Sequence, residues 1–345
     1  MNTLDFRTHE ILDAIVRLNI ETTKPVSSSL VARYLRGAYS PATIRVVMKN
    51  LEGEGFLLQP HTSAGRLPTD QGYRAFVDRV LSAWQLDRWE TPRHLQQRIT
   101  FDLQKSVSGS SLVKALATLL SKLTDNISII LGPSWESVRA LRLDLYPKEN
   151  RRVLLVLVLE NALVRTGHFQ LDRDYPRTVL LEAGRIFSER ISGHTVAEIR
   201  AGLLASFTTS DSAASRCASE LATRGRDLFS DVAEGEIELE GVSNVLDQPE
   251  FSEPGPLKAL IRFLESPSAI RDVLNRLSSQ SGDEFAVWIG KENPVGELHS
   301  FSLLSTPFDL GGRRGILAVL GPRRMPYQRA FSGMDVLRRS LQHLS

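Results

Sequence analysis

The sequence contains one cysteine, Cys217, among its 345 residues. A single thiol excludes a disulfide framework within the chain and also a cysteine-rich zinc site. Because a lone cysteine without a disulfide is typical of proteins from a reducing compartment, we expect a cytoplasmic protein.

The sequence also has no excess of charge of one sign. Its 42 Lys and Arg residues face 40 Asp and Glu residues, a formal net charge of +2. The overall charge therefore neither favours nor excludes a nucleic-acid partner, and only the distribution of charge along the chain is informative.

Long hydrophobic runs are missing as well. The N-terminus, MNTLDFRTHEILDAIV, lacks the basic start and apolar core of a signal peptide. The longest apolar run, VLLVLVLENALV, is interrupted by Glu160 and Asn161 and is too short to span a bilayer. We therefore expect no membrane partner.

Signatures of catalysis and of cofactor binding are not found. The seven His residues have no HExxH or CxxC companion, which predicts no metal site. GGRRGILAVLG lacks the spacing of a dinucleotide loop and precedes a strand, so we expect a turn and no cofactor. No acid, base and nucleophile converge in the sequence, and we do not expect an enzyme.

The charges are distributed unevenly along the chain. Residues 24–79 hold eight basic and four acidic residues, a balance of +4 (8 − 4). Residues 176–264 hold nine basic and fourteen acidic residues, a balance of −5 (9 − 14), and residues 311–345 hold seven arginines and one acid. Basic ends around an acidic middle indicate separate modules.

The order of predicted elements indicates an α+β multidomain fold. The first eighty residues are mostly helical. Strand-like segments such as NISIILGP and RRVLLVLVLE precede a mainly helical, acidic block, and EFAVWIG and RGILAVLGP follow it. Strands on both sides of such a block predict one α/β domain with a helix-rich domain inserted into it.

The stretch YSPATIRVVMKNLEGEGFLLQPHTSAGRLPTDQGYRAFVD, residues 39–78, carries the clearest functional signal. Ser40 is a good N-cap and Pro41 fits the first helical position. The apolar spacing that starts at Ile44 gives this helix a core face, and Gly55 supplies its stop. A short strand, a polar hairpin tip and a second helix capped by Thr69 follow.

The opposite face of this helix is small and partly cationic, as a helix that enters the DNA major groove requires. The hairpin tip carries hydroxyls, a His and an Arg, which are side chains that bind phosphates. This pattern predicts a reading helix beside a wing. The predicted DNA-binding residues are Ser40, Ala42, Thr43, Arg45, Val46, Lys49, His61, Thr62, Ser63 and Arg66.

Two alternatives stay open at this point. A three-helix unit with a hairpin can also be a protein–protein module, although the local charge of +4 favours DNA. The segment GPRRMPYQRA could form a second nucleic-acid patch, but we favour arginines that pair with the acidic insert or stay solvated.

The motifs SPATIR, LEGEGFL and QPHTSAGRLPTDQGYRAFVD resemble the winged-helix segment of HrcA, the bacterial heat-inducible transcription repressor family. The resemblance continues through LSKLTDN, GVSNVLDQPEF, IGKEN and GPRRMPYQRA, and so covers nearly the whole chain. The wing block and LDQPEF are its most specific parts.

The resemblance implies three domains and a function. The domains are a winged helix at residues 1–90, a GAF-like domain at residues 105–175 and 268–345, and an inserted dimerisation domain at residues 176–267. The family represses chaperone operons by binding an inverted repeat called CIRCE, and a GroEL-type chaperonin promotes its active state. We therefore expect a homodimeric repressor that binds double-stranded DNA. The alternative is a ligand-sensing winged-helix regulator with a small-molecule pocket in the GAF-like domain.

The sequence departs from the family pattern within the reading helix. After SPATIR the family usually has Asn-Glu before the Met, whereas Val46 and Val47 stand here. Val47 lies on the core face, so this change is structural. Val46 points outward and cannot form a hydrogen bond with a base, so we expect an altered base preference there.

Overall fold

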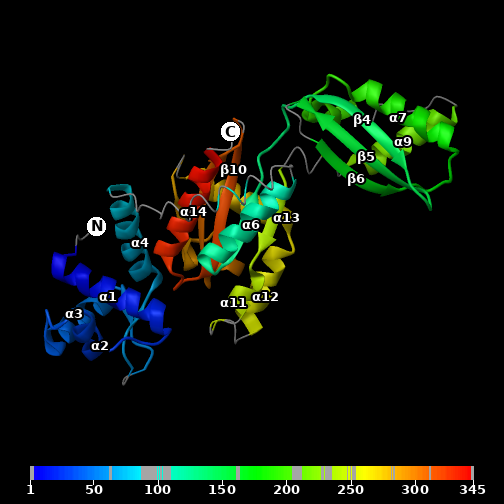
Figure 1. Ribbon diagram of the computed structural model, residues 1–345. Helices are drawn as coiled ribbons and strands as arrows, with labels where there is room; N and C mark the ends of the chain where they lie inside the picture. The colour runs from blue at the N-terminus through cyan, green and yellow to red at the C-terminus, as the bar shows by residue number, and fades with distance from the viewer. Residues whose placement is uncertain are drawn as a thin grey trace.

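The computed structural model describes residues 4–61, 64–86, 110–160, 164–203, 212–226, 235–246, 254–280, 284–310 and 312–342, with a few isolated residues between these ranges. Helices alternate with strands, and the described strands form three sheets with antiparallel pairing (Figure 1). The α+β class predicted from the sequence agrees with this arrangement.

The N-terminal unit, residues 4–86, consists of four helices and a short hairpin. The bounds are α1 Phe6–Thr22, α2 Ser28–Tyr34, α3 Pro41–Gly53, β1 Leu57–Leu58, β2 Leu67–Pro68 and α4 Asp70–Leu86. Side chains of Asp5, Ser27 and Ser40 cap the first three helices by accepting backbone N–H bonds. The helix start that the sequence predicted at Pro41 is therefore confirmed.

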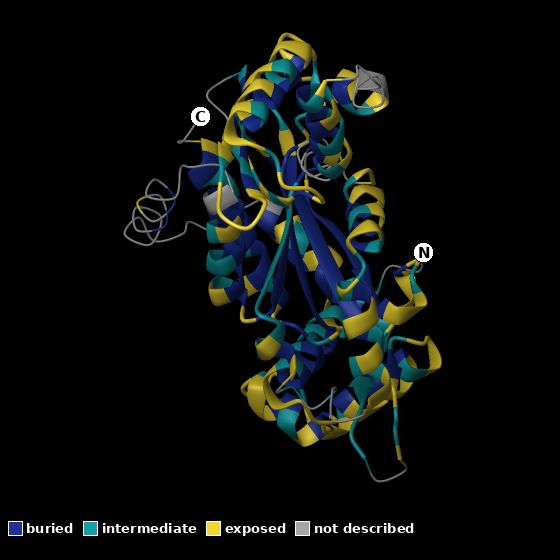
Figure 2. Cartoon of the chain, turned by 90° about the vertical axis from the view of Figure 1, so that its right-hand side faces the viewer, coloured by how far each residue is buried: buried dark blue, intermediate teal, exposed yellow. Residues whose placement is uncertain are grey.

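A five-stranded central sheet forms the middle of the molecule. Its strands are β3 Ile127–Leu131, β7 Ile237–Glu240, β8 Ala286–Ile289, β9 Phe301–Asp309 and β10 Arg314–Pro322. They lie in the order β7-β3-β10-β9-β8, and every neighbouring pair is antiparallel. Because the inner strands are covered on both faces, nearly all their residues are buried, as Figure 2 shows by the dark strands.

Helices cover both faces of the central sheet and give it two cores. Helices α6 Ser110–Thr124 and α14 Tyr327–Gln342 pack on the face that carries Ile130, Leu304 and Leu317. The other face packs on α11 Val242–Leu246, α12 Pro254–Leu264 and α13 Pro267–Ser278. The first core is continuous with the core of the N-terminal unit, so these two parts share buried side chains.

A second sheet unit lies at the opposite end of the central sheet from the N-terminal unit (Figure 1). It contains β4 Ala140–Pro147, β5 Arg152–Leu159, β6 Val164–Gln170, α7 Arg177–Ile191, α8 Val196–Glu198, the π-turn Ile199–Leu203 and α9 Ala213–Arg224. Its core is separate from the other two, and it includes Leu155, Phe187 and Cys217. This unit therefore has its own hydrophobic interior.

The strand pairing differs from the domain boundaries predicted from the sequence. Strands β4, β5 and β6 were assigned to the GAF-like domain, but they pair only with one another and pack on α7 and α9. Strand β7 was assigned to the insert, but it pairs with β3 of the central sheet. Local patterns mark a strand but do not reveal its partner, so the strand pairing was not visible in the sequence.

The chain leaves the central sheet and returns to it at a narrow crossing. The Gly132 N–H donates to the Glu236 carbonyl at 2.7 Å. Gly235 has a φ of +81°, and a Cβ placed on it would lie 2.1 Å from the Gly132 carbonyl oxygen. Glycine is therefore required at Gly235, because both the conformation and the close approach exclude a side chain.

Candidate nucleic-acid interface

Helix α3 begins with a cap that fixes its first turn. The Ser40 hydroxyl accepts the Thr43 N–H at 3.1 Å and lies 2.9 Å from the Thr43 hydroxyl. Pro41 occupies the first helical position, where no N–H bond is lost. The core face predicted from the sequence is confirmed, because Ile44, Val47, Met48 and Leu51 are all buried.

The opposite face of α3 is exposed. Val46 is 61% exposed, and Ala42, Arg45 and Lys49 are exposed around it. Thr43 is half-buried beside its cap. The predicted reading residues on α3 thus lie together on one accessible face.

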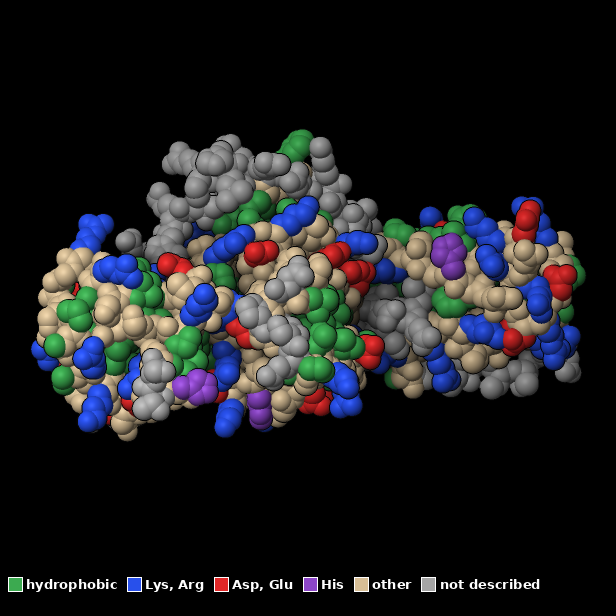
Figure 3. Space-filling view, turned by 90° about the horizontal axis from the view of Figure 1, so that it is seen from below, with side chains coloured by type: hydrophobic (Ala, Val, Ile, Leu, Met, Phe, Trp, Pro, Cys, Tyr) green, Lys and Arg blue, Asp and Glu red, His purple; other side chains and the backbone are tan. Residues whose placement is uncertain are grey.

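The exposed surface extends onto α2 and the following turn. Arg33, Tyr34 and Arg36 are exposed there, with Tyr34 41% exposed, and none of the three was predicted as a contact. On the face seen from below, basic side chains are scattered over the N-terminal unit among few acidic ones (Figure 3). The charge count of the segment was the available signal for these residues, but it does not show which cations face outward.

The hairpin after α3 protrudes from the N-terminal unit. Leu57 pairs with Pro68 and Leu58 with Leu67, and His61 is exposed near the tip. Thr62 and Ser63, which the sequence also predicted as contacts, lie outside the described residues. At the base of the hairpin, a Cβ on Gly65 would lie 2.4 Å from the Val26 carbonyl oxygen, so this position requires glycine.

Arg66 lies differently from the protruding cation that its sequence position suggested. Its Nε and Nη2 each lie 2.9 Å from Oε2 of Glu52 in α3, and its side chain is only 18% exposed. The Arg66 backbone also exchanges two hydrogen bonds with Val26, at 2.8 and 2.9 Å. Arg66 therefore joins the hairpin to α3 and to the strand-like residue Val26. The hydrogen bonds of its side chain are used within the unit.

The start of α4 is fixed to the end of α3. The Thr69 hydroxyl donates to the Gly55 carbonyl at 2.6 Å and accepts the Gly72 N–H at 3.2 Å. Gly55 has a φ of +85°, and a Cβ on Gly72 would lie 2.2 Å from the Phe56 carbonyl oxygen. These close contacts hold α3, the hairpin and α4 as one body.

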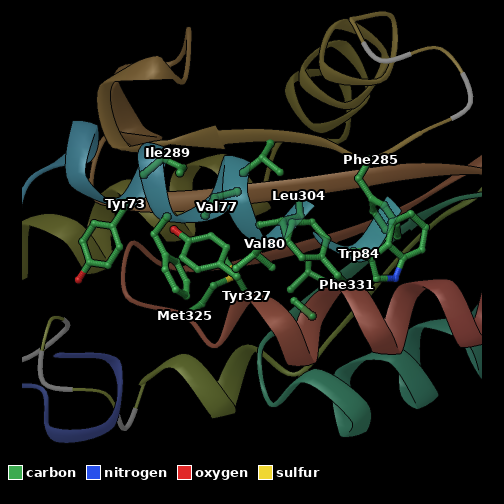
Figure 4. Packing of buried hydrophobic residues seen from close by; sticks show 14 of the residues in the cluster. Tyr73, Val77, Val80, Trp84, Phe285, Ile289, Leu304, Met325, Tyr327 and Phe331 are labelled. Atoms are coloured by element: carbon green, nitrogen blue, oxygen red, sulfur yellow. The ribbon is translucent and has the colours of Figure 1, made fainter. Parts of the chain in front are cut away.

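Helix α4 packs its buried face against the central sheet and α14, as Figure 4 shows. The Tyr73 and Tyr327 rings lie 6.4 Å apart, and Trp84 contacts Phe285 edge-on at 4.8 Å between ring centroids. Burial raises the pKa of the Tyr73 phenol above its usual value, so its hydroxyl stays protonated and donates to Asn19. The N-terminal unit is therefore joined to the central sheet through a buried contact.

The arginines of GPRRMPYQRA have partners, and one of these partners lies in the acidic segment that the sequence analysis named. Arg324 pairs with Glu250, which lies in the predicted acidic insert. Arg323 instead pairs with Asp70 at the start of α4, at 2.8 Å. Arg329 donates to the Leu123 carbonyl at 2.7 Å. These guanidinium groups each make at least one contact within the protein, and Arg323 and Arg329 are also exposed, so the second nucleic-acid patch stays an untested alternative.

A cleft of about 600 Å³ lies at one end of the central sheet, beside the crossing to the second sheet unit. Its walls include Arg271, Asn275, Arg314 and Glu136. The ligand-sensing alternative requires a polar pocket of this kind and stays a prediction. Within the described ranges, no three His, Cys, Asp or Glu side chains are grouped to hold a metal. Among the described helices, none is both long and apolar enough to cross a membrane.

Comparisons with known proteins give one consistent result. A model of the HrcA protein C-terminal domain matches residues 110–331. The heat-inducible transcription repressor HrcA of Natranaerobius thermophilus is 32% identical over 334 residues, which cover 96% of this chain and 94% of that protein. The same repressor of Chlorobium luteolum is 29% identical over 338 residues, with 95% and 93% covered. A crystal structure described as that of a hypothetical protein at 2.2 Å resolution matches with a TM-score of 0.71 at 23% sequence identity. The match covers 99% of this chain and 98% of that chain, and it shows the fold alone.

An exposed helix beside a hairpin, on a chain whose relatives are named transcription repressors, indicates the class of transcription regulators. More specifically, the chain belongs to the HrcA family of heat-inducible transcription repressors, because the family model matches more than half of its length and full-length relatives agree.

Proposed function

We propose that this protein is a negative regulator of heat-shock operons that binds a CIRCE-like inverted repeat as a homodimer. The observation that supports DNA binding most directly is the accessible face of α3, where Val46 is 61% exposed between Arg45 and Lys49. In this proposal, the N-terminal unit is a winged helix, α3 is its reading helix and the hairpin is its wing.

The small residues at the start of α3 are what groove entry requires. Ala42 and Thr43 leave room for the groove walls, and Val46 follows one turn later, where it can contact a thymine methyl. Arg45 and Lys49, one turn apart, lie together on one side of this line and reach toward phosphates on that side. Arg33 and Arg36 extend the same cationic surface along the backbone of the DNA.

The experiment is a binding titration against an inverted-repeat operator over a range of salt concentrations. Log affinity falls with log salt, and Arg45→Ala and Lys49→Ala should each make this fall less steep by about 0.9, because each removes about one released counterion. Arg276→Ala is the matched control, since Arg276 is exposed on α13, away from the N-terminal unit. Unchanged slopes in both test variants would show that α3 does not contact DNA.

The domain roles follow from the same proposal. The central sheet with its helices is the GAF-like domain, and the second sheet unit is the dimerisation domain, with bounds near 138 and 229 in place of those predicted. A two-fold operator requires a two-fold protein, because each half-site takes one reading helix.

The sheet of the second unit has an open face that suits dimer formation. Leu154, Val156 and Val158 form a half-buried apolar strip along the middle strand β5, on the side away from α7 and α9. In the neighbouring strands, Tyr146 is 51% exposed opposite Leu154, and Val164 is 46% exposed opposite Val158. Polar side chains occupy the other positions beside the strip, with Asp144 and Thr166 on either side of Val156. An apolar strip of this kind favours burial against a second copy.

Sedimentation of the full-length protein tests this assignment. Val156→Lys places a charge at the centre of the strip and should give a monomer with poor operator affinity. Leu181→Lys introduces the same change of charge at an exposed apolar position of α7 and should leave the dimer intact. A dimeric Val156→Lys protein would place the interface elsewhere.

The family resemblance also implies a GroEL-type chaperonin as a partner that promotes the active state. DNase footprinting of the operator with purified protein, with and without chaperonin, tests this part. Protection that is strengthened by the chaperonin is expected, and equal protection in both samples would contradict it.

A further inference from the structure

The first residue of α4 is seated in the central sheet by three contacts. Oδ2 of Asp70 accepts the Lys291 N–H at 3.1 Å, and Oδ1 accepts from Arg323 at 2.8 Å. Gly290 has a φ of +54°, and a Cβ on it would lie 2.3 Å from the Asp70 carboxylate. The carboxylate therefore occupies space that only glycine leaves open at the end of β8.

Arg74, one turn later on α4, makes a second set of contacts with the same segment. Its Nε donates to Oε1 of Glu292 at 2.8 Å, its Nη2 bonds to Oε2 of Glu292, and Nη2 also donates to the Val287 carbonyl at 2.7 Å. Glu292 is itself oriented, because its Oε2 accepts the Ile289 N–H at 2.8 Å. We call Asp70, Arg74, Gly290, Glu292 and Arg323 the docking contact.

Buried aromatic rings next to the docking contact also attach α4 to the core of the central sheet. Tyr73, Trp84 and Phe285 are at most 7% exposed, and the Phe285 ring also meets Phe331 edge-on at 5.1 Å (Figure 4). Arg17 of α1 adds a bond to Gln328 of α14 at 2.9 Å. Charged contacts at one end of α4 and aromatic contacts at the other restrict its rotation on the sheet.

This restriction is transmitted to the reading helix. The close approach of Gly72 to Phe56 and the Thr69 bond to Gly55 make α4 and α3 one body, so α3 cannot turn unless α4 turns. The second sheet unit lies at the far end of the central sheet. The docking contact is thus the joint that orients α3 relative to the proposed dimer axis.

We propose that the docking contact is a specificity-determining element: it fixes the separation and rotation of the two reading helices and thereby sets the spacing of operator half-sites that the dimer accepts. This inference rests on the proposed function. One added base pair between half-sites moves one of them by about 3.4 Å along the DNA axis and rotates it by about 35°. A rigid joint cannot follow that change, whereas a loosened joint can.

The test compares operators that share the same half-sites but differ in spacer length by up to two base pairs either way. Full-length wild type, Gly290→Ala and Arg74→Ala are titrated against each operator and against a single half-site. Gly290→Ala forces Asp70 out of its seat, and Arg74→Ala removes the bonds to Glu292 and Val287. The matched control is Gly296→Ala, because nothing lies within 4 Å of a Cβ at Gly296.

We expect wild type and Gly296→Ala to lose about a hundredfold or more in affinity when the spacer changes by one base pair, because the gain of about 10²–10⁴ from engaging both half-sites is lost when the geometry forbids it. In the two docking variants, this penalty should fall by about tenfold or more, while half-site affinity stays within about twofold of wild type. A merely structural role would lower affinity for every DNA alike. Arg74→Lys, which keeps the charge but not the forked geometry, should restore part of the selectivity.

The outcomes separate this inference from the proposed function. If wild type fails to bind even the full operator, the proposed function is wrong. If Arg74→Ala binds the half-site normally and keeps the wild-type spacing penalty, while hydrogen exchange at the Ile289 and Lys291 amides is accelerated, the joint has opened without effect and the inference is overturned. Should Gly290→Ala not fold, the two Arg74 variants still decide between these results.

Discussion

Replacing Arg66 by alanine should affect the stability of the hairpin and leave the salt dependence of DNA binding unchanged. Arg66 resembles a phosphate contact in the sequence, but two of its donors are held by one carboxylate oxygen of Glu52, each at 2.9 Å. Because this side chain is 18% exposed and directed at Glu52, we expect it to support the hairpin and not to contact a phosphate.

The contribution of the Arg66–Glu52 ion pair to stability depends on how far its two side chains are shielded from solvent. Hydrogen bonds to well-covered charged groups contribute about 1.5–3 kcal/mol, and exposed ion pairs contribute about 0–1 kcal/mol. Because the Glu52 side chain is 33% exposed, the contribution belongs near the boundary of these ranges. We take about 1 kcal/mol, which is about a fivefold change in a local opening equilibrium.

Hydrogen exchange at the Val26 and Arg66 amides measures this opening, since these groups bond to each other's carbonyls at the base of the hairpin. In Arg66→Ala both amides should exchange about fivefold faster. Glu52→Ala should do the same, and the double variant should be no faster than either single one, because both remove one shared interaction.

The same Arg66→Ala protein is then titrated with operator DNA over a salt range, beside Lys49→Ala as the positive control. Loss of a phosphate contact would change the affinity ratio between 50 and 200 mM salt by about threefold. If Arg66→Ala shows that change and its amides exchange at the wild-type rate, Arg66 contacts DNA and the reasoning from the ion pair is refuted.

Two further predictions concern single side chains. Val46→Asn should alter the preference at one position in a selection from a randomised half-site library, because a bidentate Asn–adenine contact is worth about 1–3 kcal/mol; identical preferences at all positions would make Val46 a neutral surface residue. Burial, with a smaller effect of Glu220, raises the pKa of Cys217 to about 12. The Cys217 side chain of the folded protein therefore stays a protonated thiol at pH 8 and should not react with iodoacetamide until denaturant is added. Rapid alkylation of native protein at pH 8 would show that this site is open to solvent.

Local sequence signals predicted the N-terminal unit well. The Ser40–Pro41 start, the spacing of Ile44, Val47, Met48 and Leu51, and the stop at Gly55 are all decided within one helix, and the structure confirms each. Interactions of this range depend on residues a few positions apart, so a single sequence contains the information that fixes them.

Contacts between distant residues were not visible in the sequence. Glu52 and Arg66 pair across the hairpin, and Asp70 meets Gly290 and Arg323 more than two hundred residues away. The strand pairing differs from the predicted grouping of strands for a related reason. β5 and β3 look alike as apolar strands, and only the register of pairing assigns them to different sheets.

The antiparallel pairing of β3 with β7 makes those two strands a β-hairpin whose connection is roughly a hundred residues long. The entropic free-energy cost of closing a flexible loop rises only slowly with loop length, by about 0.6 kcal/mol for each doubling. Here the connection folds around its own core and returns its two ends to a single hydrogen bond between Gly132 and Glu236. The hairpin is therefore closed by a folded body, and an ancestral sheet could have gained that body in one insertion without any change in strand order. The same adjacency means that a short turn joining Gly132 to Glu236 should leave a complete five-stranded sheet.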